Sequence, residues 1–163
     1  MLAGQLLAYA GMLEDKHVSW IPSYGAEMRG GTANCSVVIS AREISSPIVT
    51  EPTILVALNM PSLEKFESQV KAGGTIIYNS SLCNPPSRKD DVQILDIPAN
   101  EIAESLGTSK VANMVAVGAV VEKTGLVSMD TVVAALSKVL PEHRHNLIPL
   151  NKSALEAGAQ ASK

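Results

Sequence analysis

A short apolar run at residues 54–58, ILVAL, constrains the fold of this chain most strongly. A strand whose successive residues are all apolar has no polar face, so we expect it to be buried on both sides. Such strands occur in parallel sheets that helices cover on both faces. Aromatic residues make up only 3% of the chain, which leaves the core to Val, Ile, Leu and Ala. The run therefore predicts an α/β fold.

The rest of the chain alternates between strand patterns and helix patterns. Strands are predicted at 18–21, 35–40, 54–58, 75–79 and 92–97, and helices at 2–13, 61–70, 100–107, 110–121, 130–140 and 152–161. We expect the first strand to end at Pro22 and Asn100 to cap a helix. Segment 110–121 is nearly apolar all round, which predicts a central helix. The alternation is typical of a three-layer, Rossmann-like sheet flanked by helices.

Length, charge and hydropathy exclude several classes of function. The 163 residues suffice for one sizeable core, so we expect a single domain over 1–163. The net charge of -3, without a Lys/Arg cluster, argues against a nucleic-acid partner. The longest apolar stretches fall well short of the roughly 20 residues that span a bilayer. Because 2–13 also lacks the basic start of a signal peptide, we expect a cytoplasmic protein.

The sequence offers no metal site and no catalytic residue. Cys35 and Cys83 are the two cysteines and form no CxxC pair, so the chain alone can hold neither zinc nor an iron–sulfur cluster. We expect both to be reduced, largely buried thiols whose redox role the sequence leaves open. His143 and His145 do not share a helix face, and His17 has no nucleophile near it. The glycine-rich fingerprints for NAD and ATP are absent.

The most distinctive segment is the polar, Gly-rich stretch 23–34, SYGAEMRGGTAN, which we expect at the end of a strand, where α/β sheets bind ligands. Arg29 can hold a phosphate or carboxylate through two parallel hydrogen bonds, with Glu27 fixing the guanidinium. Alternatively, Glu27 and Arg29 pair only with each other while the glycines make turns. The residues alone leave both open. The candidate site residues are Tyr24, Gly25, Glu27, Arg29, Gly30, Gly31 and Asn34.

A second set of polar residues follows two neighbouring predicted strands. Asn59 comes after 54–58, and Asn79, Ser80 and Ser81 end or follow 75–79. If these strands are parallel, the four residues lie at the same edge of the sheet and can line one cleft. The alternative is that they form turns and cap helices, which is the commoner role of Asn and Ser.

Residues 20–35, WIPSYGAEMRGGTANC, closely resemble the signature loop of the gamma subunit of 2-oxoacid:ferredoxin oxidoreductases. Further matches cover nearly the whole chain. They are Leu58-Asn59, Gly73-Gly74-Thr75, Asn79-Ser80-Ser81, 111–114 (VANM) and 151–158 (NKSALEAG).

The resemblance implies a subunit, inactive alone, of a thiamine-diphosphate enzyme. That enzyme oxidatively decarboxylates a 2-oxoacid, passes electrons through iron–sulfur clusters to ferredoxin and forms an acyl-coenzyme A. Thiamine diphosphate, magnesium and the clusters belong mainly to partner subunits of alpha, beta and delta type. The gamma domain is associated with access of coenzyme A, so Arg29 and the Gly30-Gly31 backbone become candidates for contacting its phosphates or a neighbouring subunit. The resemblance favours 2-oxoglutarate, with branched-chain 2-oxoacids and pyruvate open.

The chain departs from this family at its start. Members usually begin with a strand and a Gly-Gly-Gln-Gly loop, so we expect an N-terminally shortened domain that lacks the first strand and exposes a sheet edge. Two other functions stay open. One is a stand-alone binding module that holds a phosphorylated small molecule at Tyr24 to Asn34, and the other is a structural subunit whose loop forms an interface.

Overall fold

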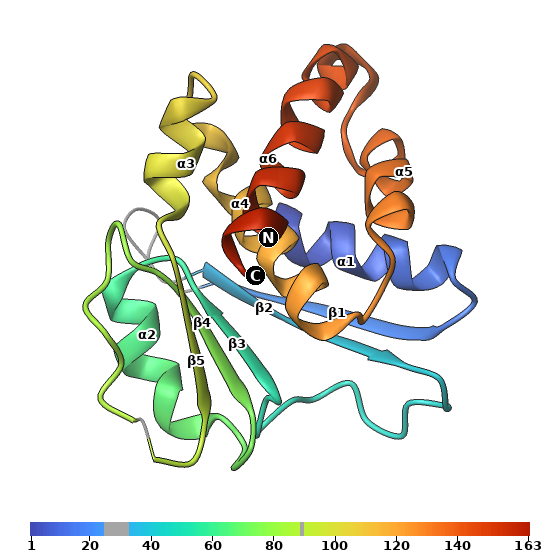
Figure 1. Cartoon of the computed structure of the whole chain (residues 1–163). Helices are drawn as coiled ribbons and strands as arrows, with labels where there is room; N and C mark the ends of the chain where they lie inside the picture. Colours follow the sequence, from blue (N-terminus) through green and yellow to red (C-terminus); the bar gives the residue numbers. More distant parts are fainter. Residues whose placement is uncertain (25–32, 89) are drawn as a thin grey trace. The chain divides into compact units, whose positions relative to one another are not determined.

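The computed structural model describes residues 1–24, 33–88 and 90–163 (Figure 1). Its helices are α1 (Leu2–Leu13), α2 (Met60–Phe66), α3 (Ala99–Ser105), α4 (Ala112–Thr124), α5 (Met129–Val139) and α6 (Ile148–Ala161). Its strands are β1 (His17–Tyr24), β2 (Ala33–Ser40), β3 (Ile54–Ala57), β4 (Thr75–Asn79) and β5 (Gln93–Ile97). Short 3-10 helices are η1 (Glu67–Gln69), η2 (Ser109–Val111) and η3 (Glu142–Leu147). The predicted α/β class is confirmed.

The contacts of the chain group into two compact units. The first unit contains Met1–Val49 and Leu126–Ile148, and the second contains Thr50–Gly125 and Pro149–Lys163. A single domain over the whole chain stays a prediction.

The first unit holds an antiparallel pair of strands, β1 and β2, in register from His17 opposite Ser40 to Tyr24 opposite Ala33. The prediction that β1 ends at Pro22 is wrong, because the strand continues to Tyr24 with Pro22 opposite Cys35. In a two-stranded sheet each strand has an open edge, where a residue without an N–H is tolerated.

Helix α1 packs against one face of this pair at very short range. A Cβ added at Gly11 would lie 2.9 Å from a methyl group of Val18, and one added at Gly4 would overlap the sulfur of Cys35. Because the two glycines lie seven residues apart, they fall on one face of the helix. The small residues of α1 therefore set its distance from the strands.

An ionic and hydrogen-bonded contact joins the end of α1 to the start of α5 within the first unit. Glu14 Oε1 accepts a 2.6 Å hydrogen bond from the backbone N–H of Ser128, and its Oε2 accepts one of 2.8 Å from Lys16 Nζ. Lys16 Nζ also donates to the carbonyl oxygen of Leu126 at 2.5 Å. Ser128 itself caps α5 by accepting from the N–H of Thr131. The hydrogen bond from Lys16 to the Glu14 carboxylate, followed by the bond from the Ser128 N–H, lowers the pKa of Glu14 from 4.5 to about 2.

The second unit contains a parallel sheet in the order β3-β4-β5. Its central strand β4 is almost wholly buried. Ile76 and Tyr78 form a core cluster with Leu63 of α2, whereas Ile77 faces the opposite side of the sheet because strand side chains alternate. Helix α4 also contacts β4. Within this unit the sheet therefore has buried side chains on both faces, as predicted for the α/β class.

The prediction that residues 54–58 form a doubly buried strand is correct in position and wrong in burial. Strand β3 covers Ile54–Ala57, but the side chain of Val56 is 38% exposed. Among the described strands β3 pairs with β4 alone, so it lies at an edge of the three-stranded sheet. The doubly buried position belongs to β4, because β4 has a neighbour on each side.

Helices α4 and α6 cross in the second unit with their backbones in contact. A Cβ added at Gly118 would overlap the carbonyl oxygen of Leu155, and one added at Gly158 would overlap that of Val115. The contact is therefore reciprocal and leaves no space for any side chain. Helix α4 is buried continuously from Met114 to Val121, which confirms the predicted central helix.

We expect Gly118→Ala to lower the free energy of unfolding by about 1–3 kcal/mol, because the new methyl group would force two backbones apart. In an exposed helix the same change would raise the free energy of unfolding by about 0.5–1 kcal/mol. The sign of the measured change therefore shows whether the backbones of α4 and α6 are in contact at Gly118. Chemical denaturation followed by circular dichroism measures the effect. Gln160→Ala, at an exposed position of α6, is the control and should have little effect. A stabilising Gly118→Ala would contradict the close crossing.

We expect Glu14→Gln to lower the free energy of unfolding at pH 7 by about 1–2 kcal/mol, because a neutral amide replaces a hydrogen-bonded carboxylate. The folded-state pKa of Glu14 is depressed, so its contribution is complete above pH 4.5 and disappears as the pH falls toward 2. The difference between variant and wild type should therefore shrink between pH 4.5 and pH 2. Denaturation at several pH values tests this, with the exposed Glu43→Gln as control. A difference that stays constant over this range would exclude the depressed pKa.

Candidate functional site

The Gly-rich segment singled out in the sequence lies between the two strands of the antiparallel pair. Gly25, Glu27, Arg29, Gly30 and Gly31 lie outside the described residues. The other two candidate site residues are described. Tyr24 ends β1 with 70% of its surface exposed, and Asn34 is half-buried in β2 opposite Ser23.

The expected position of this segment needs a correction. It follows the end of a strand, as predicted, but that strand, β1, pairs with β2 in an antiparallel ladder. The argument from the ligand-binding edge of parallel sheets therefore does not apply to it. What the structure shows at this point is an exposed aromatic side chain at the end of a hairpin.

The second predicted set of residues does lie at one edge of a parallel sheet. Strands β3 and β4 are parallel with Ala57 beside Tyr78, so the residues that follow both strands occur at the same edge. Asn59 is exposed, and its Oδ1 accepts a 3.0 Å hydrogen bond from the N–H of Ser62, which caps α2. That these residues line a ligand cleft stays a prediction, because the hydrogen bond of Asn59 matches the capping alternative.

Asn79 is the buried centre of this edge, with only 3% of its surface exposed. Its Nδ2 donates to the carbonyl oxygen of Leu58 at 3.3 Å and to Asn100 Oδ1 at 2.8 Å. Its Oδ1 accepts the N–H of Ala99 at 3.0 Å. Helix α3 begins at Ala99, so Asn100 lies in the first turn and is not the cap that the sequence predicted.

Ser80 and Ser81 continue from Asn79 along the same edge. The N–H of Ser80 donates to the carbonyl oxygen of Ile97, and Ser81 Oγ accepts the N–H of Glu101 at 3.4 Å. Leu82, the next residue, is 56% exposed. The segments after β3, β4 and β5 are therefore joined to one another, which the sequence did not predict because Asn100 lies 21 positions from Asn79.

The two thiols differ in their surroundings. Cys83 is buried in the core cluster beside Tyr78, and this burial raises the pKa of both side chains. A raised pKa keeps the thiol protonated and weakly nucleophilic at neutral pH. Cys35 is half-buried, so the expectation of a buried thiol is met fully only at Cys83. Both are free in the structure.

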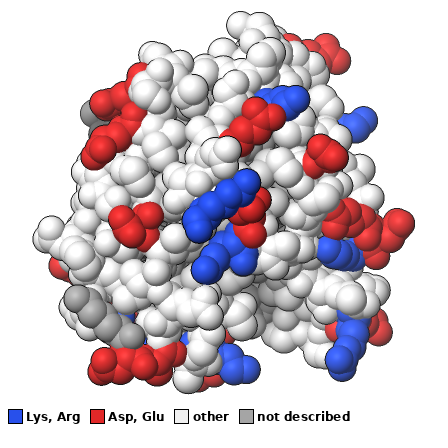
Figure 2. Space-filling view, in the orientation of Figure 1, with Lys and Arg blue, Asp and Glu red and all other residues white. Residues whose placement is uncertain are grey.

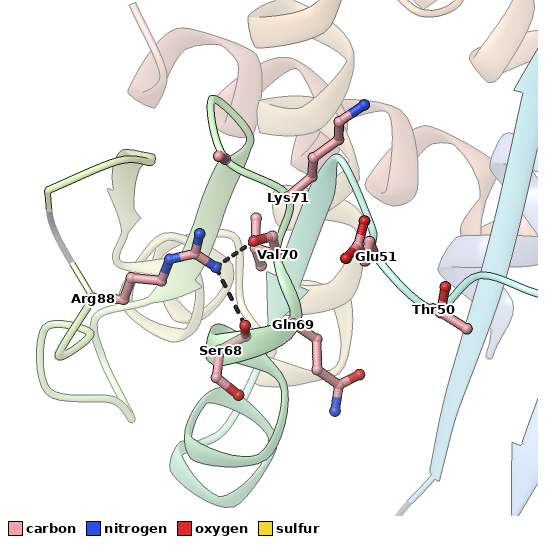
Figure 3. Close-up of a pocket in the computed structure, with 8 residues that line it drawn as sticks. Thr50, Glu51, Ser68, Gln69, Val70, Lys71 and Arg88 are labelled. Carbon is pink, nitrogen blue, oxygen red and sulfur yellow. Dashed lines mark hydrogen bonds between the residues drawn. The ribbon is translucent and has the colours of Figure 1, made fainter.

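A hollow of about 600 Å³ lies at the opposite edge of the parallel sheet and was not predicted (Figure 3). Its lining residues precede β3 and β4 or belong to the loop before β5: Thr50, Glu51, Ser68, Gln69, Val70, Lys71, Ala72 and Arg88. Lys71 lies near Gly73-Gly74 in the sequence, but Arg88 lies 17 positions beyond Lys71, so no local pattern indicated the hollow.

All three guanidinium nitrogens of Arg88, which lines this hollow, donate hydrogen bonds within the protein. Its Nε and Nη2 donate to the two carboxylate oxygens of Asp91 at 2.7 and 2.5 Å, and this pairing lowers the pKa of Asp91. Its Nη1 donates to the carbonyl oxygens of Glu67 and Ser68 in η1 and of Val70 just after it, and Figure 3 shows the bonds to Ser68 and Val70. The side chain of Lys71 extends away from Arg88 (Figure 3). Arg88 therefore stabilises the end of this helical segment through hydrogen bonds to its carbonyl oxygens.

Figure 2 shows basic side chains interspersed with acidic ones on the displayed face. Within residues 1–24, 33–88 and 90–163, no helix combines the length and apolar character needed to cross a membrane. The same residues contain no cluster of three or more His, Cys, Asp or Glu side chains suited to a metal ion.

The chain is similar to known proteins along almost its whole length. It is 38% identical over 157 residues to the ketoisovalerate oxidoreductase subunit VorA of Methanothermobacter marburgensis, a match that covers 96% of this chain and 32% of the relative. It is also 38% identical over 148 residues to the 2-oxoglutarate synthase subunit KorC of the same organism, covering 86% of this chain and 80% of that protein. This chain thus spans about a third of the length of the VorA relative.

A solved structure and a family model agree with these similarities. The gamma subunit of a keto/oxoacid ferredoxin oxidoreductase from Geobacter sulfurreducens PCA superimposes with a TM-score of 0.82 at 30% identity, covering 99% of this chain and 89% of that one. The model of the pyruvate ferredoxin/flavodoxin oxidoreductase family matches residues 1–161. The chain therefore belongs to the pyruvate ferredoxin/flavodoxin oxidoreductase family.

Proposed function

We propose that this chain is the gamma component of a 2-oxoacid:ferredoxin oxidoreductase. In the proposed reaction a 2-oxoacid loses carbon dioxide, its acyl group is transferred to coenzyme A, and two electrons pass to ferredoxin. The observation that carries the proposal is the similarity to the gamma subunit from G. sulfurreducens over 99% of the chain. A cytoplasmic location belongs to the same proposal.

The iron–sulfur clusters of the proposed reaction do not fit this chain's own residues. An iron–sulfur cluster needs about four thiolates, and the sequence has two cysteines, one of them buried in a hydrophobic core. We therefore assign the iron–sulfur clusters, thiamine diphosphate and magnesium to partner subunits of alpha, beta and delta type. No step of the chemistry is assigned to a side chain of this chain.

Within such a complex we assign the segment around Tyr24 and Arg29 to the subunit interface. Tyr and Arg are enriched at the centres of protein interfaces, and Tyr24 already exposes 70% of its surface at the end of β1. The hydroxyl and the aromatic ring can then be buried together against a partner. The alternative is that Arg29 contacts the phosphates of coenzyme A. Substitution of Arg29 distinguishes the interface role from the phosphate contact.

The preferred 2-oxoacid is 2-oxoglutarate in this proposal. The KorC relatives, named as 2-oxoglutarate synthase subunits, support it. The VorA relatives, named for ketoisovalerate, are 38% and 40% identical, against 38% and 34% for these KorC relatives. Ketoisovalerate is therefore the competitor that the assay must include.

Anaerobic purification of the tagged chain from its native host tests the proposal directly. We expect a brown eluate that contains larger subunits, iron–sulfur absorption and thiamine diphosphate. It should reduce ferredoxin when both a 2-oxoacid and coenzyme A are present, with kcat/KM highest for 2-oxoglutarate among 2-oxoglutarate, ketoisovalerate and pyruvate. A colourless, unaccompanied chain would contradict the proposal and favour a stand-alone binding module. A higher kcat/KM for ketoisovalerate would overturn only the substrate preference.

The interface assignment predicts that Tyr24→Ala and Arg29→Ala each reduce the yield of co-purified partner subunits. The loss of a central interface residue costs about 2 kcal/mol or more, enough to weaken association at least tenfold. The residual complex should keep the wild-type KM for coenzyme A. Ser23→Ala, an exposed neighbour in β1, is the control and should assemble normally. Normal assembly of Arg29→Ala with a raised KM for coenzyme A would instead favour the phosphate contact.

A further inference from the structure

Strand β5 is the outer strand at one side of the three-stranded sheet (Figure 1). Among the described strands it pairs with β4 alone. Gln93, its first residue, donates its N–H to the carbonyl oxygen of Gly74 at 2.8 Å. In a parallel ladder every second residue bonds to the same neighbour. The backbone N–H and carbonyl groups of Ile94 and Asp96 therefore point away from β4.

These outward backbone groups are open to a further strand. In the described part of the chain, the N–H and carbonyl groups of Ile94 and Asp96 have no hydrogen-bond partner. Both side chains are exposed as well. A row of unpaired N–H and carbonyl groups on an extended strand is a template with which another strand can pair.

The face of β5 that carries Ile94 also lacks a covering helix. Ile94 is in register with Ile76, so its side chain lies on the sheet face where Leu63 of α2 buries Ile76. Two parallel strands are usually joined by a crossover that carries a helix. The described part of residues 80–92, between β4 and β5, contains no helix. Ile94 consequently stays outside the core cluster and is 37% exposed.

The segment that contains β5 is acidic. Residues 90–109 contain no Lys or Arg, and their acidic residues are Asp90, Asp91, Asp96, Glu101 and Glu104. Asp91 pairs with Arg88, and no described cation lies within ion-pair distance of the other four. Like charges on neighbouring strands repel and opposite charges attract. A second copy of this segment is therefore a poor partner for β5, and a basic strand is a good one.

We propose that β5 accepts an added strand from a partner subunit, and that this strand carries a Lys or Arg two positions from an apolar residue. Its backbone pairs with the outward groups of Ile94 and Asp96. Because Ile94 and Asp96 lie on one face of β5, the cation pairs with the Asp96 carboxylate while the apolar side chain covers Ile94. The inference rests on the proposed function, which supplies the partner subunits. It goes beyond the interface assigned around Tyr24, which belongs to the first unit.

Hydrogen exchange of the purified wild-type complex, resolved to single amides, tests the added strand without any substitution. The N–H groups of Leu95 and Ile97 bond to β4 whether or not a strand is added, so they are internal references. With an added strand, Ile94 and Asp96 should exchange within about tenfold of these references. Faster exchange of Ile94 and Asp96 than this would overturn the inference.

Charge reversal tests the basic character of the partner strand. At low salt we expect Asp96→Lys to reduce the yield of co-purified partner subunits at least about tenfold, and Asp96→Asn about threefold, because like charges meet in the first variant. Glu64→Lys makes the same change of charge at an exposed position of α2 and should assemble normally. Equal losses in Asp96→Lys and Glu64→Lys, or full retention in Asp96→Lys, would contradict a basic strand.

The competing role of Asp96 is to prevent β5 from pairing with a second copy of the chain. Asp96→Asn would then increase self-association, measured by light scattering, while the partner subunits are retained. That result would overturn the inference. If Asp96→Lys does not fold, the exchange measurement on the wild-type complex decides. Failure of the proposed function is a separate result, because the wild-type chain would then co-purify with no partner subunit.

Discussion

The reciprocal contact of Gly118 with Leu155 and of Gly158 with Val115 is the constraint on which the second unit depends. Backbone contact brings the carboxyl-terminal helix α6 against α4, although they are separated by a segment that belongs to the first unit. Dense packing of this kind gains many small dispersion contacts and tolerates no added atom. The contact therefore fixes α4, which in turn contacts the central strand β4.

The two edges of the parallel sheet are held together by different polar side chains. At the amino-terminal edge, the guanidinium of Arg88 donates to Asp91 and to carbonyl oxygens of η1. At the carboxyl edge, Asn79 satisfies its own amide internally, while Asn59 is exposed and Ser80 and Ser81 are half-buried. Arg88 and Asn79 are therefore both used in hydrogen bonds within the protein.

The sequence predicted the helices and the parallel strands well because their apolar patterns are local. Helix α1 was predicted with its observed bounds, and β4 likewise. The prediction was wrong or incomplete where the local structure depends on residues far away in the chain. Pro22 was expected to end a strand, but the open edge of a two-stranded sheet accommodates it. The candidate residues Asn59 and Asn79 were identified as lying at one edge, but the link from Asn79 to Asn100 depends on strand order, which no local pattern encodes.

By itself, the sequence determined the α/β class, the shortage of thiols for a metal cluster and the family, since these follow from composition, periodicity and a long matching segment. Only the tertiary structure decided that β3 lies at an edge while β4 is central, that Arg88 is committed to internal bonds, and that Asn79 joins three segments. The physical reason is that burial and hydrogen-bond partners are properties of pairs of residues far apart in the chain. A side chain's capacity to bind is encoded locally, but whether that capacity is already used depends on the fold.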